Sequence, residues 1–178
     1  MILFAALVVI SILVFIPIFV KVLGPNQKEY AGVVLTFRTN IKDAEDVRVI
    51  PNEQTLKDLF LRVPPNRIDL VWIDNETENP YYAVDGFEIA AKLSVIYQYN
   101  FGINVDIVPA NVSSVDEVRN LLEQDNIVIL MLGPSHANKT AVTVENNLVI
   151  LEGQSLETNK EYTDIDLSTT KVLLTLME

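Results

Sequence analysis

The chain has 178 residues, of which 13 are Lys or Arg and 24 are Asp or Glu, and its formal net charge is -11. A surface of this sign repels phosphate groups, so we expect no binding to nucleic acid. There is no cysteine and only one histidine, which excludes disulfides, thiolate metal sites and a multi-histidine metal site within one chain. We expect no metal and no cofactor.

The chain opens with an uncharged apolar run. From Ile2 to Val20 the only polar side chain is Ser11. A helix of this length spans about 30 Å, the hydrocarbon thickness of a bilayer. No small-residue cleavage pattern follows the run, and a Gly-Pro pair is expected to end the helix. The sequence therefore predicts an uncleaved transmembrane anchor over residues 1–23 of a single-pass cell-membrane protein, with the lipid bilayer as its partner.

Two signals disagree about the side of the membrane on which the rest of the chain lies. Positive charges that follow the run favour a cytoplasmic domain, and they come from Lys21, Lys28 and Arg38. Three Asn-x-Ser/Thr sequons favour the outside, and their possible glycosylation sites are Asn75, Asn111 and Asn138. We expect an extracytoplasmic C-terminal domain, in a prokaryotic envelope.

Residues 24–30 are expected to form a linker, and residues 31–178 one acidic, soluble domain. In the first part of this domain, β-branched and aromatic residues predict strands at 31–38 and 68–73, with a weaker one near 47–50. Asn52 is typical of a helix cap, and the apolar residues after it have helical spacing up to a Pro-Pro pair. We expect a helix there.

Residues 84–99 carry the strongest helical pattern of the domain. One face of this helix is marked by Phe87, Ala90, Ala91, Val95 and Tyr99, and it is widened by Ile89, Leu93 and Ile96. We expect this wide apolar face to be buried.

The second half of the domain continues the alternation. A strand is predicted at 103–108, ending at Pro109, and Ser114 with Glu117 predicts a capped helix after it. The continuous apolar run at 126–132 is typical of a strand buried on both faces. Two short β runs around an Asn-rich turn predict a hairpin over 140–152, and a helix is expected within 167–177.

This order of elements predicts an α/β sandwich domain with a mainly parallel sheet. The hairpin near the C-terminus is expected to extend one edge of that sheet in the antiparallel sense.

Ligands of parallel sheets bind where the strands end at their carboxyl edge. Asp74 follows the strand at 68–73, and its turn could hold a hard cation with the help of Asp85, although a solvated acidic turn is the simpler interpretation. Ser135 and His136 follow the strand at 126–132 and could act as nucleophile and base, although adjacent side chains rarely face each other. These four residues are the candidate ligand-binding residues, and no catalytic residue is assigned.

No phosphate-binding loop and no nucleophile–base pair stands out. We therefore expect a non-catalytic binding or structural role in a cell envelope or membrane assembly, with other membrane or envelope proteins as partners. One alternative is a small-ligand sensor or an enzyme that uses the strand ends near Asp74 and His136. Another is an accessory subunit that its apolar helix holds in a larger membrane complex.

Overall fold

The computed structural model describes residues 23–122, 126–157 and 162–178. Within these ranges, no helix combines the length and the apolar composition needed to cross a bilayer. Residues 1–22 of the predicted anchor lie outside the described residues, and the anchor stays a prediction.

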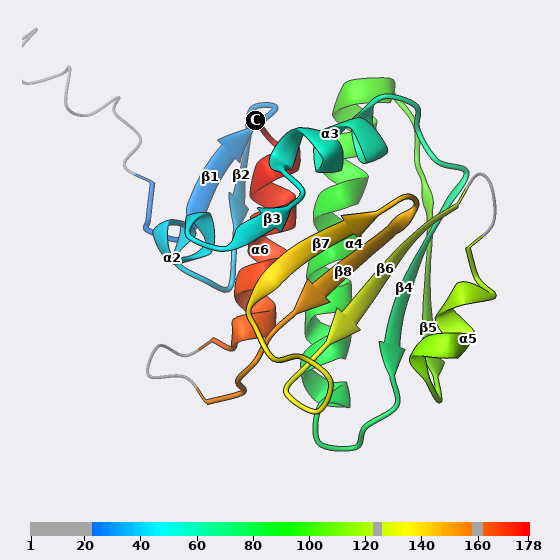
Figure 1. The fold of residues 1–178 in the computed structure, drawn as a ribbon. Coiled ribbons are helices and arrows are strands. Elements are labelled where there is room, and N and C mark those ends of the chain that lie inside the picture. Colours follow the sequence, from blue (N-terminus) through cyan, green and yellow to red (C-terminus); the bar gives the residue numbers. More distant parts are fainter. Residues whose placement is uncertain (1–22, 123–125, 158–161) are drawn as a thin grey trace, which may run out of the picture.

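A mixed six-stranded sheet forms one layer of the fold (Figure 1). In spatial order its strands are β3 (Arg48–Ile50), β7 (Ala141–Glu145), β8 (Leu148–Glu152), β6 (Asn126–Leu132), β4 (Arg67–Ile73) and β5 (Asp106–Val112). The last four of these run parallel to one another, whereas β7 is antiparallel to β8 and β3 is parallel to β7. The predicted α/β class is confirmed. The predicted edge position of the hairpin β7–β8 is wrong, because β3 pairs outside it.

A second, two-stranded sheet lies before the main one in the chain. Its antiparallel strands are β1 (Gln27–Tyr30) and β2 (Val33–Thr36). Ala31 and Gly32 connect them with φ angles of 53° and 77°, the pair of positive values that a tight type I′ hairpin turn needs. The strand expected at 31–38 therefore belongs to a separate hairpin, and its partner β1 lies within the expected linker.

Helices cover both faces of the main sheet. The larger core cluster lies between the sheet and three helices, α3 (Glu53–Leu61), α4 (Asn79–Phe101) and α6 (Asp164–Leu176), with the short α2 (Ile41–Glu45) packed against α6. The short α5 (Val115–Arg119) covers a smaller apolar cluster on the opposite face. Both faces of β6 are consequently buried, as its continuous apolar sequence predicts.

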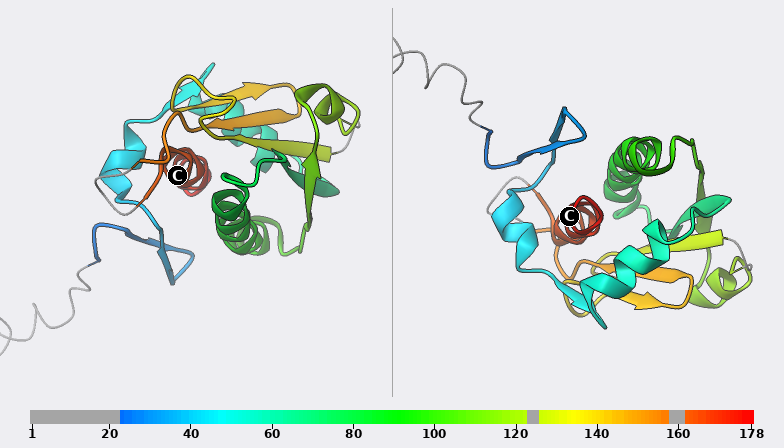
Figure 2. Two further views of the ribbon diagram at one scale, coloured as in Figure 1. Left: turned by 90° about the horizontal axis from the view of Figure 1, so that it is seen from below. Right: turned by 90° about the horizontal axis from the view of Figure 1, so that it is seen from above.

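The C-terminal helix α6 lies in the middle of the molecule (Figure 2). It contacts α2, α3, α4 and the hairpin β7–β8, and eleven of its thirteen residues are buried. A capping box begins it: Thr163 accepts from the Asp166 N–H, and the Asp166 carboxylate accepts from the Thr163 N–H at 2.6 Å. The expected helix is confirmed, and it begins three residues earlier than residue 167.

Two local predictions can be compared directly with the structure. Asn52 caps α3, since its side chain accepts from the Thr55 N–H at 2.9 Å. The strand expected to end at Pro109 instead runs through it to Val112, opposite β4. Because β5 is at the edge of the sheet, the N–H that proline lacks is not needed by a further strand.

The buried face of α4 is only partly the one expected. Phe87 is 76% exposed, Tyr99 is 64% exposed, and Ala91 is also exposed. The helix buries Ile89, Leu93 and Ile96, as expected, together with three charged side chains. The prediction failed because α4 is apolar on most of its circumference, so spacing alone could not say which face meets the core.

Candidate functional site

The order in which the chain adds strands to the sheet reverses between β4 and β6. From β4 the chain passes through α4 to β5 on one side, whereas from β6 it passes to β7 and β8 on the other side. Such a switch point at the carboxyl edge of parallel strands is where open α/β sheets bind ligands. Two segments meet there, residues 74–78 after β4 and residues 133–140 after β6 (Figure 1).

The first segment is a turn built by asparagine side chains. The Asn75 side-chain oxygen accepts from the N–H groups of Thr77 and Glu78, at 3.0 and 3.3 Å. The Asn79 side chain accepts from the Asn75 N–H at 3.1 Å and donates to Asp74 at 2.9 Å. These bonds hold the turn before the helix, and the turn places Glu78 at the N-cap of α4.

The buried carboxylate of Glu78 joins the two segments. One of its oxygens accepts from the Ser135 hydroxyl at 2.6 Å and from the Ser135 N–H at 2.9 Å. Its other oxygen accepts from the Tyr82 hydroxyl, which in turn accepts from the Gly133 N–H at 2.6 Å. The loop after β6 is thus fastened to the first turn of α4.

These contacts decide the charge of Glu78. Burial raises its pKa, but the hydrogen bonds that it accepts from Ser135 and Tyr82 outweigh burial, and the net shift is downward. The charge of a protonated His136 acts in the same direction. Glu78 is therefore ionised at neutral pH. Its partner Tyr82 has a raised pKa, through burial first and through its bond to Glu78 second.

Gly133 is required by this arrangement. A Cβ at this position would lie 2.5 Å from the Glu78 carboxylate and 2.8 Å from the Tyr82 hydroxyl. The loop can therefore approach the carboxylate closely only because residue 133 has no side chain.

Of the four predicted ligand-binding residues, three lie at this edge. Asp74, Ser135 and His136 are exposed on the two facing segments. Ser135 donates to Glu78 and accepts from the Asn75 amide at 3.0 Å, so Glu78, and not His136, is the base that its hydroxyl meets. Glu78 and Tyr82 are not among the four predicted residues, although their spacing of four residues at a helix start was a usable signal.

Asp85, the fourth predicted residue, lies elsewhere. It is fully buried two turns into α4, facing α6. In the described part of the chain, neither of its carboxylate oxygens meets a hydrogen-bond donor. Burial raises the pKa of Asp85 well above its usual value, and the negative charges of Asp166 and Glu88 raise it further.

The surroundings of Asp85 form a polar seam between α4 and α6. Arg38 reaches Asp166 at 2.7 Å, and its positive charge opposes the upward shift of the Asp85 pKa. On α4, Lys92 pairs with Glu88 at 3.0 Å and lies over the Phe37 ring. The described residues contain no group of three or more acidic, His or Cys side chains placed to hold a metal ion, so Asp85 does not complete a cation loop with Asp74.

The three possible glycosylation sites have different surroundings. Asn75 is partly buried, and its amide nitrogen is the donor to Ser135, so a glycan there would break a bond of the site. Asn111 is exposed within the edge strand β5, whereas Asn138 is exposed in the loop after β6.

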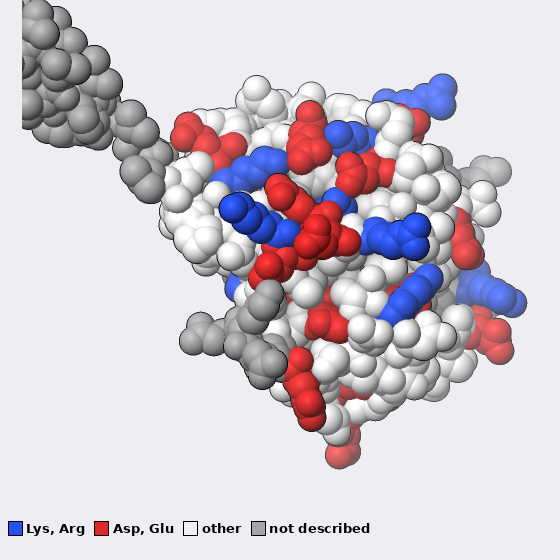
Figure 3. All heavy atoms as spheres, turned by 60° about the vertical axis from the view of Figure 1, so that its left-hand side comes forward, with Lys and Arg blue, Asp and Glu red and all other residues white. Residues whose placement is uncertain are grey.

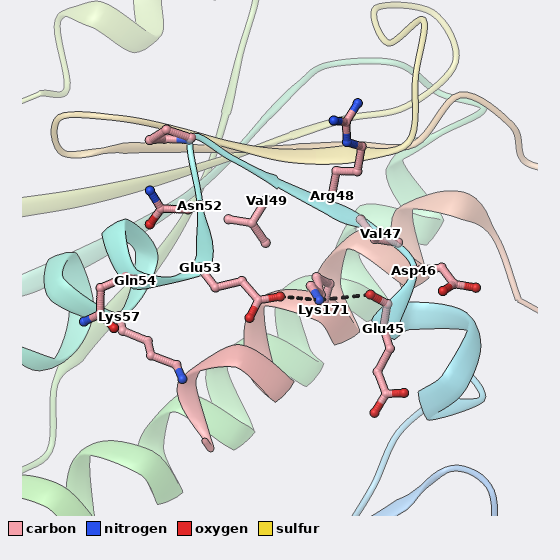
Figure 4. Close-up of a pocket in the computed structure, with 11 residues that line it drawn as sticks. Glu45, Asp46, Val47, Arg48, Val49, Asn52, Glu53, Gln54, Lys57 and Lys171 are labelled. Carbon is pink, nitrogen blue, oxygen red and sulfur yellow. Dashed lines mark hydrogen bonds and ion pairs between the residues drawn. The ribbon is translucent and has the colours of Figure 1, made fainter.

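A cavity of about 690 Å³ opens beside α3 and β3 (Figure 4). Lys171 of α6 points to it and donates to the Glu45 carbonyl oxygen at 3.0 Å and to the Glu53 carboxylate at 2.6 Å. The Lys171 hydrogen bond lowers the pKa of Glu53 more than burial raises it. The lysine is thus neutralised by its own neighbours and links α6 to α2 and α3. The surface on this side of the molecule carries acidic and basic side chains next to one another (Figure 3).

A third feature is an apolar groove of about 390 Å³ between α4 and the strands β4 and β5. Its walls include Trp72, Gly86, Phe87 and Pro109, and no charged side chain lines it. Of the features described, this groove offers apolar surface to a partner.

No family model, no curated protein and no solved structure matches this chain.

Proposed function

We propose that this chain is a single-pass membrane protein whose α/β domain has a non-catalytic binding or structural role in an envelope or membrane assembly. The evidence for the transmembrane anchor is the uncharged run from Ile2 to Val20. The observation that favours a non-catalytic role is the pairing at the switch point. The carboxylate that the Ser135 hydroxyl meets, Glu78, has a lowered pKa and is therefore a weak base, and its bonds to Ser135 and Tyr82 fasten the loop after β6 to α4.

The anchor can be tested by placing charge in the run. Two arginines, Val8→Arg with Ile12→Arg, cost together about 6 kcal/mol of insertion free energy at a helix centre. We expect the wild-type chain to stay with membranes under alkaline extraction and the double variant to be released. Val8→Leu with Ile12→Leu is the matched control and should behave as the wild type. Release of the wild-type chain would overturn the anchor.

Orientation and partners need a second experiment. Protease added to intact cells should digest the domain if it is extracytoplasmic, as we propose, and protection until lysis would place it in the cytoplasm. Purification in mild detergent should retain partner proteins in fixed ratio if the chain serves an assembly, as a binding module or as an accessory subunit. A monodisperse monomer without partners would contradict the assembly role.

A small-ligand sensor is the second candidate, because the structure brings Asp74, Ser135 and His136 to one switch point. The variants His136→Ala and Asp74→Asn change exposed side chains and should leave folding intact. A ligand response or activity that both variants abolish would favour this candidate over the non-catalytic role.

A further inference from the structure

The charged side chains of α4 lie on its buried side, and not on the side that faces solvent. Its three charged residues, Asp85, Glu88 and Lys92, are 0%, 6% and 8% exposed. They belong to the polar seam with α6, where Lys92 pairs with Glu88. Surface helices normally bury apolar residues and expose charged ones. The exposed side of α4 therefore has no charge over 23 residues, in a chain of net charge -11.

The exposed side of α4 is aromatic and aliphatic where a charged surface would be expected. Phe87 is 76%, Tyr99 64%, Val84 40% and Tyr81 36% exposed. Small or uncharged residues, such as Ala91 and Ser94, lie between them. We call this side of the helix the α4 face. Exposed apolar residues are common singly, but a contiguous uncharged set of this kind marks a surface that meets another apolar phase.

The α4 face is continued on both sides by apolar surface. Toward the sheet it borders the groove lined by Trp72 and Pro109. Toward the N-terminal hairpin it borders a shallow hollow, in which Val33 of the β1–β2 turn lies near Val95 and Tyr99. Val33 is itself 49% exposed. The uncharged surface thus extends from the hairpin tip across α4 to β5.

This surface lies on the side of the molecule where the described chain begins. Both views in Figure 2 place the first described residues, the hairpin β1–β2 and α4 on the side away from the six-stranded sheet. Pro25 is already fixed to the domain, because its carbonyl accepts from the Ile41 N–H at 2.9 Å. Only four residues separate it from Val20, which is a reach of at most about 18 Å.

We propose that the α4 face rests on the bilayer surface into which residues 1–23 insert. This inference depends on the anchor of the proposed function and adds the orientation of the domain. A short connection holds the domain against the lipid, and the side that faces the membrane is the one without charge. Phe87 and Val84 then enter the headgroup region, and the Tyr81 and Tyr99 hydroxyls stay at the water interface.

Lipid fits this surface better than a second copy of the chain does. Two copies would approach with a charge of -11 each, and their repulsion opposes association. The α4 face also has no Lys or Arg, so it has no attraction for anionic headgroups. We therefore expect contact with neutral phosphatidylcholine, weakened rather than strengthened by anionic lipid.

The absence of native cysteine allows a direct test. Ala91→Cys places one thiol in the middle of the α4 face, and Glu145→Cys places one on an exposed residue of the hairpin β7–β8 as the matched control. Each full-length variant is labelled with a small fluorophore and reconstituted in phosphatidylcholine vesicles that contain a nitroxide-labelled lipid. We expect quenching at residue 91 to exceed quenching at residue 145 by about threefold or more, because a docked face enters the headgroup layer.

A second variant separates contact from mere proximity. Phe87→Glu, added to Ala91→Cys, puts a carboxylate into the contact and should reduce the quenching at residue 91 to the level at residue 145. Equal quenching at the two positions overturns the proposal, as does a disulfide-linked dimer of unlabelled Ala91→Cys under oxidising conditions when the labelled sample shows no quenching.

Alkaline extraction of the same vesicles keeps this result distinct from the anchor. A chain that resists extraction but shows no quenching at residue 91 retains the anchor and loses the docked α4 face. A chain that is extracted loses both.

Discussion

Glu78 and Asp85 are two buried carboxyl groups two turns apart at the start of one helix, and their pKa values are shifted in opposite directions. Glu78 accepts hydrogen bonds from Ser135 and Tyr82, and its pKa is lowered although burial alone would raise it. Asp85 meets no donor among the described residues and faces Asp166, and its pKa is raised. The difference shows that the hydrogen-bond donors around a carboxyl group, and not its depth of burial, decide the direction in which its pKa shifts.

The two carboxyl groups therefore stabilise the fold in opposite ranges of pH. A carboxylate with a lowered pKa contributes stability above the pKa of the unfolded chain, about 4.3 for Glu, and loses it as the pH falls through the folded value. A carboxyl with a raised pKa has no cost below the pKa of the unfolded chain, about 3.9 for Asp, and destabilises increasingly as the pH rises above it. Four variants test this comparison.

The largest effect is expected for Glu78→Ala. It leaves the Ser135 N–H and the Tyr82 hydroxyl without their acceptor, which should lower the free energy of unfolding at pH 7 by about 3 kcal/mol. Urea unfolding measures the loss. Glu76→Ala, at an exposed residue of the same turn, is the control and should change the stability by less than about 0.5 kcal/mol. Equal effects of the two variants would mean that the Glu78 contacts do not hold the loop.

Gly133→Ala should come next, with a loss of about 2 kcal/mol, because its Cβ would lie against a carboxylate that hydrogen bonds hold in place. Gly86→Ala is the control, since its Cβ would make only an ordinary contact with Leu70 at 3.7 Å in a helix that favours alanine. We expect Gly86→Ala to be neutral or stabilising in thermal unfolding. A loss as large as that of Gly133→Ala would contradict the assigned geometry.

Asp85→Asn should have the opposite sign at neutral pH. The amide has the shape of the protonated carboxyl and cannot ionise, so we expect a gain in stability that is smaller than the loss in Glu78→Ala. The gain should grow as the pH rises from about 4, where the wild-type residue begins to be penalised. Unfolding curves between pH 4 and pH 8 measure it. A wild type and a variant with parallel pH profiles would show that Asp85 titrates normally.

The smallest effect is expected for His136→Ala. The side chain is exposed, so the free energy of unfolding at pH 7 should change by less than about 0.5 kcal/mol. The same measurement on Ser135→Ala should give about 1 kcal/mol, because that variant removes a hydrogen bond to Glu78. A larger effect of His136→Ala than of Ser135→Ala would give the histidine a role in the network that its position does not suggest.

Much of the local structure could be predicted because its cause is local. The cap at Asn52, the buried strand β6 and the Asn-rich hairpin turn each depend on a few neighbouring residues. The grouping of Asp74 with Ser135 and His136 followed from one general rule about parallel strands. The partners of Glu78 could not be predicted in this way, because the contact with Ser135 joins residues 57 positions apart.

The remaining errors come from competition between non-local contacts. The strand at 31–38 has strand propensity, but β3 and not this segment pairs with β7. Part of the buried face of α4 was misassigned because it also contains three charged residues, of which Glu88 and Lys92 pair with each other and Asp85 meets no donor among the described residues. Asp85 was grouped with Asp74 for its proximity in sequence, but α4 carries it two turns away from the loop, where it is buried near Asp166 of α6.

The central position of α6 has a consequence for biosynthesis. Every element that it touches is made earlier in translation, and its contacts reach back across 126 positions to Glu45 and 128 to Arg38. Until residues 164–176 have left the ribosome, the apolar sides of α3, α4 and the sheet lack the helix that packs against them. We therefore expect the nascent domain to stay incompletely packed and accessible to chaperones until α6 is made. We expect a chain that stops before α6 to be degraded by quality-control proteases.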